Sequence, residues 1–238
     1  MSGMFLTVLS FGFILGLKHA LDPDHMVAVS TIVSESKSVK RSSLVGTFWG
    51  LGHTVSLLLA GIIVIGLKVQ ISNRVALWME FAVALMLMLL GIKAILKPLR
   101  GWKLHRHRHT HDGSTHTHVH LHRPGEVQRH QHRHMISIGV RPLLVGMIHG
   151  MAGSAALTLL VLTTMPSAIA GLIYIVIFGL GSVGGMLIMS SLIGLPFVLT
   201  PKRFSMLTEG LQGAVGLCSF SFGLFLAWQH VFHNNLIF

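Results

Sequence analysis

Six long apolar segments constrain the fold of this 238-residue chain more than any other feature of its sequence. Hydrophobic residues make up 52% of the chain and charged residues only 11%, whereas about a quarter of the residues in a soluble domain are charged. A helix needs roughly 20 apolar residues to cross a bilayer. We therefore predict an all-α membrane protein with six transmembrane helices. The segments lie near residues 4–33, 43–67, 75–96, 140–165, 167–195 and 205–229.

The positions of the basic residues predict the orientation of these helices. A net charge of +11 is also typical of nucleic-acid binders, but fourteen of the eighteen Lys and Arg residues lie in the connections 34–42, 97–141 and 200–204. The opposite side carries only Lys68 and Arg74. Because basic loops stay in the cytoplasm, these connections are predicted to be cytoplasmic and both termini to lie outside. The charge thus indicates membrane topology and no nucleic-acid partner.

The two halves of the chain contain an internal repeat. Three pairs of segments align at a displacement of 129 or 130 residues, namely 16–19 with 146–149, 48–53 with 177–182, and 79–80 with 208–209. Three spans in each half place the halves in opposite orientations, and inverted repeats are typical of secondary transporters. We predict inverted three-helix repeats over 1–99 and 140–238, joined by a His-rich cytoplasmic loop over 100–139.

The first apolar segment contains a cluster of ionisable residues, His19-Ala20-Leu21-Asp22-Pro23-Asp24-His25. Ionisable groups at membrane depth are costly and usually functional, and imidazoles with carboxylates form a ligand set for divalent transition metals. Pro23 cannot donate to the His19 carbonyl. We therefore predict a kink or unwound turn at 19–23 that frees this carbonyl for water or an ion.

Helical geometry ranks the ligands within this cluster. On an unbroken helix His19, Asp22 and His25 share one 120° arc, whereas Asp24 points elsewhere. We predict these three residues as metal ligands, with Asp24 joining them if the helix unwinds. The alternative is a self-neutralised structural cluster in which Lys18 pairs with a carboxylate.

The segment from Lys18 to His25 resembles the H-A-x-D-A-D-H signature of the nickel/cobalt transporters, the NiCoT or NicO superfamily, with Pro in place of the inner Ala. Leu51-Gly52-His53-Thr54 is similar to a second motif of that superfamily. Family members commonly have eight spans, and the segment 149–156 looks like that of the shorter, urease-accessory type of nickel permease. The resemblance implies a transporter of Ni²⁺ or Co²⁺ without catalytic residues or a cofactor.

Two further histidines, His53 and His149, each stand alone in an apolar segment. Such residues are more often packing residues than ligands. However, His53 follows a Gly-Leu-Gly that permits close helix approach, and His149 occupies the repeat position of His19. We predict both in the substrate path. Glu80 and Glu209 occupy equivalent positions at helix ends, where solvation is the favoured interpretation and a role in the path remains open.

The loop 100–139 is a second candidate metal-binding region. Its eleven histidines are His105, His107, His109, His111, His116, His118, His120, His122, His130, His132 and His134. Histidine-rich tracts bind divalent ions but cannot build a core, so we predict disorder without metal. We expect an auxiliary buffer or sensor whose loss leaves transport intact; the alternative is a solvated linker.

These features predict a bacterial inner-membrane permease for Ni²⁺ or Co²⁺ whose contacts are lipid and the transported ion. A dication moving inward through 100 mV gains about 4.6 kcal/mol, which favours uptake driven by the membrane potential. The alternative is efflux by proton exchange. A remote alternative is an enzyme. His19 and Asp24 also fit the H-x-x-x-x-D pattern of acyltransferases, and an intramembrane metallohydrolase could use His and Asp ligands around zinc with an activated water. An oligomer and a cytosolic metal acceptor are left open.

Overall fold

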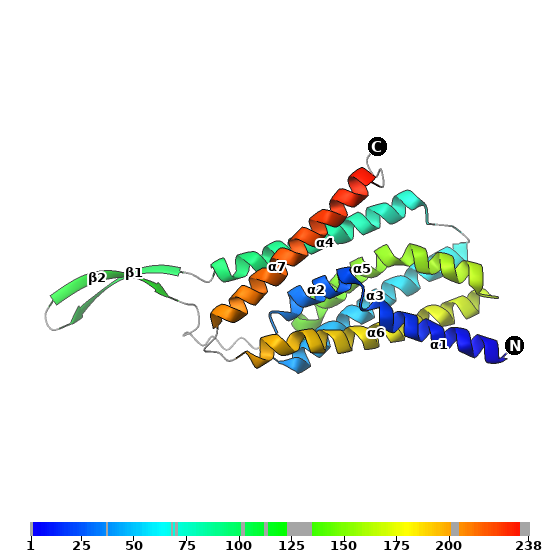
Figure 1. Ribbon diagram of the computed structural model, residues 1–238, viewed down its shortest axis with the longest axis horizontal. Helices are drawn as coiled ribbons and strands as arrows, with labels where there is room; N and C mark the ends of the chain where they lie inside the picture. The colour runs from blue at the N-terminus through cyan, green and yellow to red at the C-terminus, as the bar shows by residue number, and fades with distance from the viewer. Residues whose placement is uncertain are drawn as a thin grey trace.

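The computed structural model describes residues 2–36, 38–67, 69, 71–100, 103–111, 114–122, 135–200 and 205–233. Within these ranges the helices are α1 (Ser2–His19), α2 (Pro23–Val33), α3 (Val39–Leu67), α4 (Asn73–Arg100), α5 (Met135–Thr164), α6 (Ala168–Leu199) and α7 (Ser205–Trp228). A π-helical turn, η2 (Gln229–His233), continues α7. Strands β1 (Lys103–His111) and β2 (Ser114–His122) form a hairpin that projects from one end of the helical bundle (Figure 1).

The helical architecture is that of a membrane protein. Within the described part of the chain, four helical segments are long and apolar enough to cross a bilayer: Val39–Leu67, Asn73–Lys97, Ala168–Leu199 and Met206–His233. They coincide with the second, third, fifth and sixth predicted segments. The apolar part of α1, Leu6–His19, is shorter than a span, because the first predicted segment is divided into α1 and α2.

The division between α1 and α2 falls where Pro23 predicted an interruption. Pro23 begins α2, a position where its missing N–H removes no helical hydrogen bond. The preceding residue, Asp22, has extended backbone angles (φ −61, ψ 141). However, the His19 carbonyl is not freed as predicted, because the Asp22 N–H donates to it at 3.1 Å. The break tightens into a turn and leaves this carbonyl already bonded.

The helices of the two halves pack in matching pairs. Helix α1 packs against α6 as α5 packs against α3, while α3 contacts α6 and α4 contacts α7 (Figure 1). A Cβ atom on Gly16 would collide with the carbonyl oxygen of Phe178, and one on Gly146 would collide with that of Trp49. These glycines are equivalent in the sequence repeat, as are the two residues they contact. Both helix pairs therefore depend on the same close backbone approach.

A second pair of glycines repeats the pattern from the opposite side of each contact. A Cβ atom on Gly52 in α3 would meet the carbonyl oxygen of Leu143, and one on Gly181 in α6 would meet that of Phe13. The two glycines are 129 residues apart in the sequence, and the two residues that they contact, Phe13 and Leu143, are 130 residues apart. Equivalent positions thus make equivalent contacts in α1–α6 and α5–α3.

The segment between α4 and α5 differs from the predicted disordered loop over 100–139. Helix α4 extends to Arg100 and α5 begins at Met135. Strands β1 and β2 pair antiparallel, with His105 opposite His120 and His109 opposite His116. Alternating sequences favour strands, and the intervening pair Asp112-Gly113 is a strong hairpin signal. The remaining predicted residues His130, His132 and His134 lie outside the described residues.

Candidate metal centre

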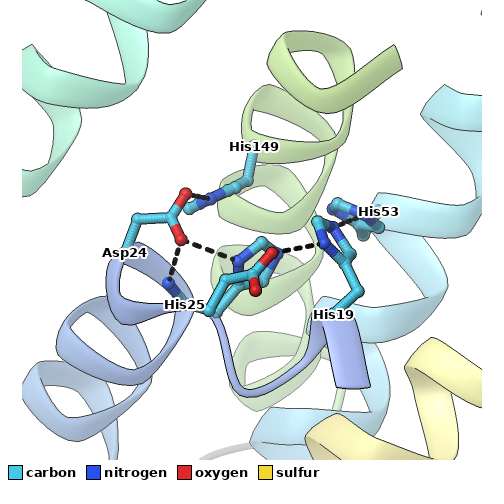
Figure 2. Close-up of polar contacts among 6 residues, drawn as sticks. His19, Asp24, His25, His53 and His149 are labelled. Carbon is cyan, nitrogen blue, oxygen red and sulfur yellow. Dashed lines mark hydrogen bonds and ion pairs between the residues drawn. The ribbon is translucent and has the colours of Figure 1, made fainter. Parts of the chain in front are cut away.

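The break between α1 and α2 brings side chains from four helices together (Figure 2). His19 ends α1, Asp24 and His25 lie in the first turn of α2, His53 lies in α3, and His149 lies in α5. We call these five residues the Asp–His cluster. His25, His53 and His149 are almost completely buried, with exposed fractions of 1%, 0% and 2%. Because imidazole is seldom buried without a partner or ligand, this concentration makes the cluster a candidate functional site.

The spacing of the donor atoms suits a metal ion. They form two groups, His19–His25–His53 and Asp24–His25–His149, and within each group the ligand atoms lie within 4.8 Å of one another. Ligand atoms about 2.0–2.1 Å from one metal lie about 3–4 Å from each other. His25 belongs to both groups. One imidazole therefore links two adjacent positions, each of a size to hold an ion.

Asp24 orients the histidines on either side of it. Its Oδ1 lies 3.0 Å from the backbone N of His25 and 3.2 Å from His25 Nδ1, and its Oδ2 lies 2.8 Å from His149 Nε2. An ionised carboxylate only accepts hydrogen bonds, so the ring nitrogens that face it carry the protons. The Nε2 of His25 and the Nδ1 of His149 then keep their lone pairs for a ligand.

Asp22 acts on His19 in the same way. Its Oδ2 lies 2.6 Å from His19 Nδ1, which leaves His19 Nε2 as the lone-pair nitrogen, 3.2 Å from Nε2 of His53. Carboxylates that fix the tautomer of a metal-binding histidine are a common outer shell in metal sites. Asp22, with 46% of its side chain exposed, lies outside both metal-sized groups.

The structure therefore reverses the order that helical geometry predicted for the two carboxylates. Asp24 lies inside a metal-sized group and Asp22 does not. The reason is that the 120° arc assumed an unbroken helix, whereas the turn at 20–22 starts α2 in a new direction. Within the described residues both carboxylates pair with histidines, and the ion pair of Lys18 considered for a structural cluster is not among those found.

Several buried nitrogens of the cluster lack a hydrogen-bond partner. These atoms are His25 Nε2, His53 Nδ1 and His149 Nδ1. Leaving a buried polar atom unsatisfied costs about 1–3 kcal/mol. For His25 the unsatisfied nitrogen is the one that Asp24 leaves unprotonated. A divalent cation at this atom would supply the missing interaction.

The cluster opens into a cavity of about 260 Å³. The cavity is also lined by Glu80 of α4 and by Gln229 and His230 of η2, whereas Glu209 is not among its lining residues. Glu80, whose role the sequence left open, thus reaches the cavity. Sequence reasoning missed Gln229 and His230, because no motif marks them and their position depends on how α7 packs against α4.

Eight of the eleven predicted loop histidines lie in the two hairpin strands. They are His105, His107, His109, His111, His116, His118, His120 and His122. The hairpin projects from the end of the bundle, away from α1 (Figure 1). A metal-binding role of this region remains a prediction from its sequence.

Comparison with known proteins gives one family and three relatives. Residues 3–203 match the family model NicO, described as high-affinity nickel-transport protein. The chain is 42% identical over 219 residues to urease accessory protein UreH of Bacillus sp. (strain TB-90), covering 92% of this chain and 90% of the relative.

Two more distant relatives come from Arabidopsis thaliana. They are the chloroplast proteins FOR GROWTH AND FERTILITY 2 and 1, each 26% identical, over 94% and 90% of this chain. The alignments cover only 57% and 56% of these two proteins. No solved structure matches the chain.

Proposed function

The chain belongs to the NicO family of high-affinity nickel-transport proteins, and we propose that it carries Ni²⁺ or Co²⁺ into the cell through the Asp–His cluster. The family match confirms the resemblance predicted from the sequence motifs. Membership makes the chain a nickel/cobalt permease and not an enzyme, which rules against the metallohydrolase and acyltransferase alternatives. The metal ion is the substrate of transport.

The main support for the proposed site comes from the contacts of His25. Asp24 holds its Nδ1, its Nε2 is buried without a partner, and it belongs to both metal-sized groups. Imidazole nitrogens with one carboxylate suit Ni²⁺ and Co²⁺ better than Mg²⁺ or Ca²⁺, which prefer oxygen ligands. We propose that the ion binds first to one of the two groups and then passes to the other, with His25 as a ligand in both.

We further propose that six spans form two inverted three-helix repeats, over 1–99 and 140–238, in the inner membrane of a bacterium. The first span would consist of α1 and α2, and the fourth of α5. The equivalent glycine contacts of α1–α6 and α5–α3 support this arrangement. The basic connections support a cytoplasmic location of the hairpin segment and external termini.

The proposed direction is uptake driven by the membrane potential. An inward-moving dication gains about 4.6 kcal/mol per 100 mV, so uptake needs no coupled ion. Efflux would require another energy source, such as proton exchange. A flux measurement under an imposed potential tests this direction.

The test is radioactive nickel flux into proteoliposomes under an imposed inside-negative potential. We expect accumulation with the wild type, and a reduction of about 10- to 100-fold with His25→Ala or Asp24→Asn. Gel filtration of each variant in detergent controls for folding. Undiminished flux in both variants would overturn the site assignment. Flux found only outward from the hairpin side, and only with an opposing proton gradient, would establish efflux instead.

A further inference from the structure

The cavity that contains the Asp–His cluster has a second polar group on its wall. Glu80, Gln229 and His230 line the cavity, together with apolar residues that include Val83 and Leu226. Glu80 comes from α4 and the other two polar residues from η2. A cavity in a membrane bundle that joins two sets of polar side chains is a candidate ion path.

The contact within this second group resembles a pair of metal ligands. His230 Nδ1 lies 3.5 Å from Glu80 Oε2. This distance exceeds the 2.7–2.9 Å typical of a charge-assisted hydrogen bond, and it lies within the roughly 3–4 Å that separates two ligands of one ion. The side chain of His230 is 9% exposed and that of Glu80 is 45% exposed. The pair thus extends from the protein interior to its surface.

The backbone at His230 is also unusual. Residues Gln229–His233 form a π-helical turn at the end of α7. Such turns are rare and frequently occur at functional sites, because the extra residue in the turn changes the direction of the side chains that follow. Here the turn places Gln229 and His230 at the cavity, while His233 is exposed.

The second group lies on one side of the molecule. Glu80 follows the start of α4 by two turns and His230 follows the end of α7, and both of these helix ends point away from the hairpin (Figure 1). The repeat-equivalent carboxylate, Glu209, does not line the cavity. With the hairpin in the cytoplasm, the second group faces the outside, where an ion arrives during uptake.

From these observations we propose that Glu80, Gln229 and His230 form a second, weaker site for a divalent transition-metal cation, which receives the ion before it reaches the Asp–His cluster. This inference rests on the proposed function for its direction. A carboxylate, an imidazole and an amide oxygen supply fewer strong donors than the cluster does. Weak binding suits an entry site, because conduction requires that each ion also leaves.

The transport test compares two variants with matched controls. Glu80→Gln and His230→Ala should raise the KM for Ni²⁺ uptake about 10-fold, the size of effect seen when a metal site loses a supporting group, while the maximal rate is retained. Glu80→Asp, which keeps the carboxylate, should raise KM less. The controls are Glu209→Gln, the equivalent carboxylate outside the cavity, and His233→Ala, the exposed histidine of the same turn; neither should change KM.

A direct binding measurement separates this proposal from the proposed function. Calorimetric titration of the purified protein with Ni²⁺ should show a weak site that is lost in His230→Ala and retained in His233→Ala and His25→Ala. If the wild type transports nickel but KM and the weak site are unchanged in Glu80→Gln and His230→Ala, the entry site is overturned and the permease stands. If the wild type transports nothing while the weak site still depends on His230, the permease proposal fails and the cation site stands.

A purely structural role for the Glu80–His230 pair predicts a different result. The variants would then lower the thermal unfolding midpoint in detergent and leave KM unchanged. That combination would also overturn the entry site.

Discussion

The two halves of this chain pack alike but carry different chemistry. Gly16 and Gly146 occupy equivalent positions and allow equivalent backbone contacts. In contrast, His53 of α3 is matched in α6 by Ser182; both are fully buried, and each has a side-chain atom without a hydrogen-bond partner. Close helix packing therefore needs the same small residues in both halves. At this pair of positions, the Asp–His cluster takes an imidazole from the first half alone.

The first helix of each half shows the same contrast. The first half is broken between His19 and Pro23, whereas α5 continues without a break from Met135 to Thr164. The positions equivalent to Asp22 and Asp24 are Ala152 and Ser154. Because these two positions of α5 carry no carboxylate, no interruption is needed there to turn one toward the cluster. The negative charge of the Asp–His cluster thus comes from the first half, while the second half contributes His149.

The strongest test of this difference between the halves truncates the side chains at one pair of equivalent positions. His53→Ala should reduce nickel flux about 10- to 100-fold, because it removes a nitrogen donor that faces His19. Ser182→Ala should leave the flux unchanged. Initial rates in proteoliposomes measure both. Equal losses in the two variants would mean that these positions act through packing.

A second test concerns packing itself, where the halves should behave alike. Gly16→Ala and Gly146→Ala should each lower the free energy of unfolding by about 1–3 kcal/mol, because the added methyl meets a carbonyl oxygen of the facing helix. Thermal unfolding in detergent measures this effect. Gly213→Ala is the control, since no atom lies within 4 Å of its added Cβ; it should be neutral or stabilising by up to about 1 kcal/mol. A large loss in only one of the first two variants would contradict equivalent packing.

The smallest effect is expected for the segment that joins the halves. Replacing residues 103–122 by a short Gly/Ser linker should leave the nickel flux unchanged, because the hairpin projects away from the bundle (Figure 1). The number of Ni²⁺ ions bound per chain at equilibrium should fall, because eight histidines are removed. Abolished flux after this replacement would show that the hairpin segment is part of the path.

Most of the candidate site was predictable, because its residues can be recognised in the sequence as ionisable side chains within apolar segments. His19, His25, His53 and His149 all meet in the structure, and Pro23 marked the helix break. The order of Asp22 and Asp24 was not predictable. It depends on the backbone angles of the turn at 20–22, and a helical wheel has no meaning across a break. His230 was missed because its partner, Glu80, is remote in sequence.

By itself, the sequence determined the helical membrane architecture, the family, the four histidines of the cluster and the equivalent glycines. These follow from local chemistry, since the length of an apolar segment, the presence of proline and the type of each residue have their effects whatever the tertiary structure. Only the tertiary structure decided which carboxylate enters the cluster, which nitrogen of His25 remains unprotonated, and that Glu80 and His230 line the same cavity. Each of these depends on distances of a few ångströms between helices, which packing of the whole bundle sets.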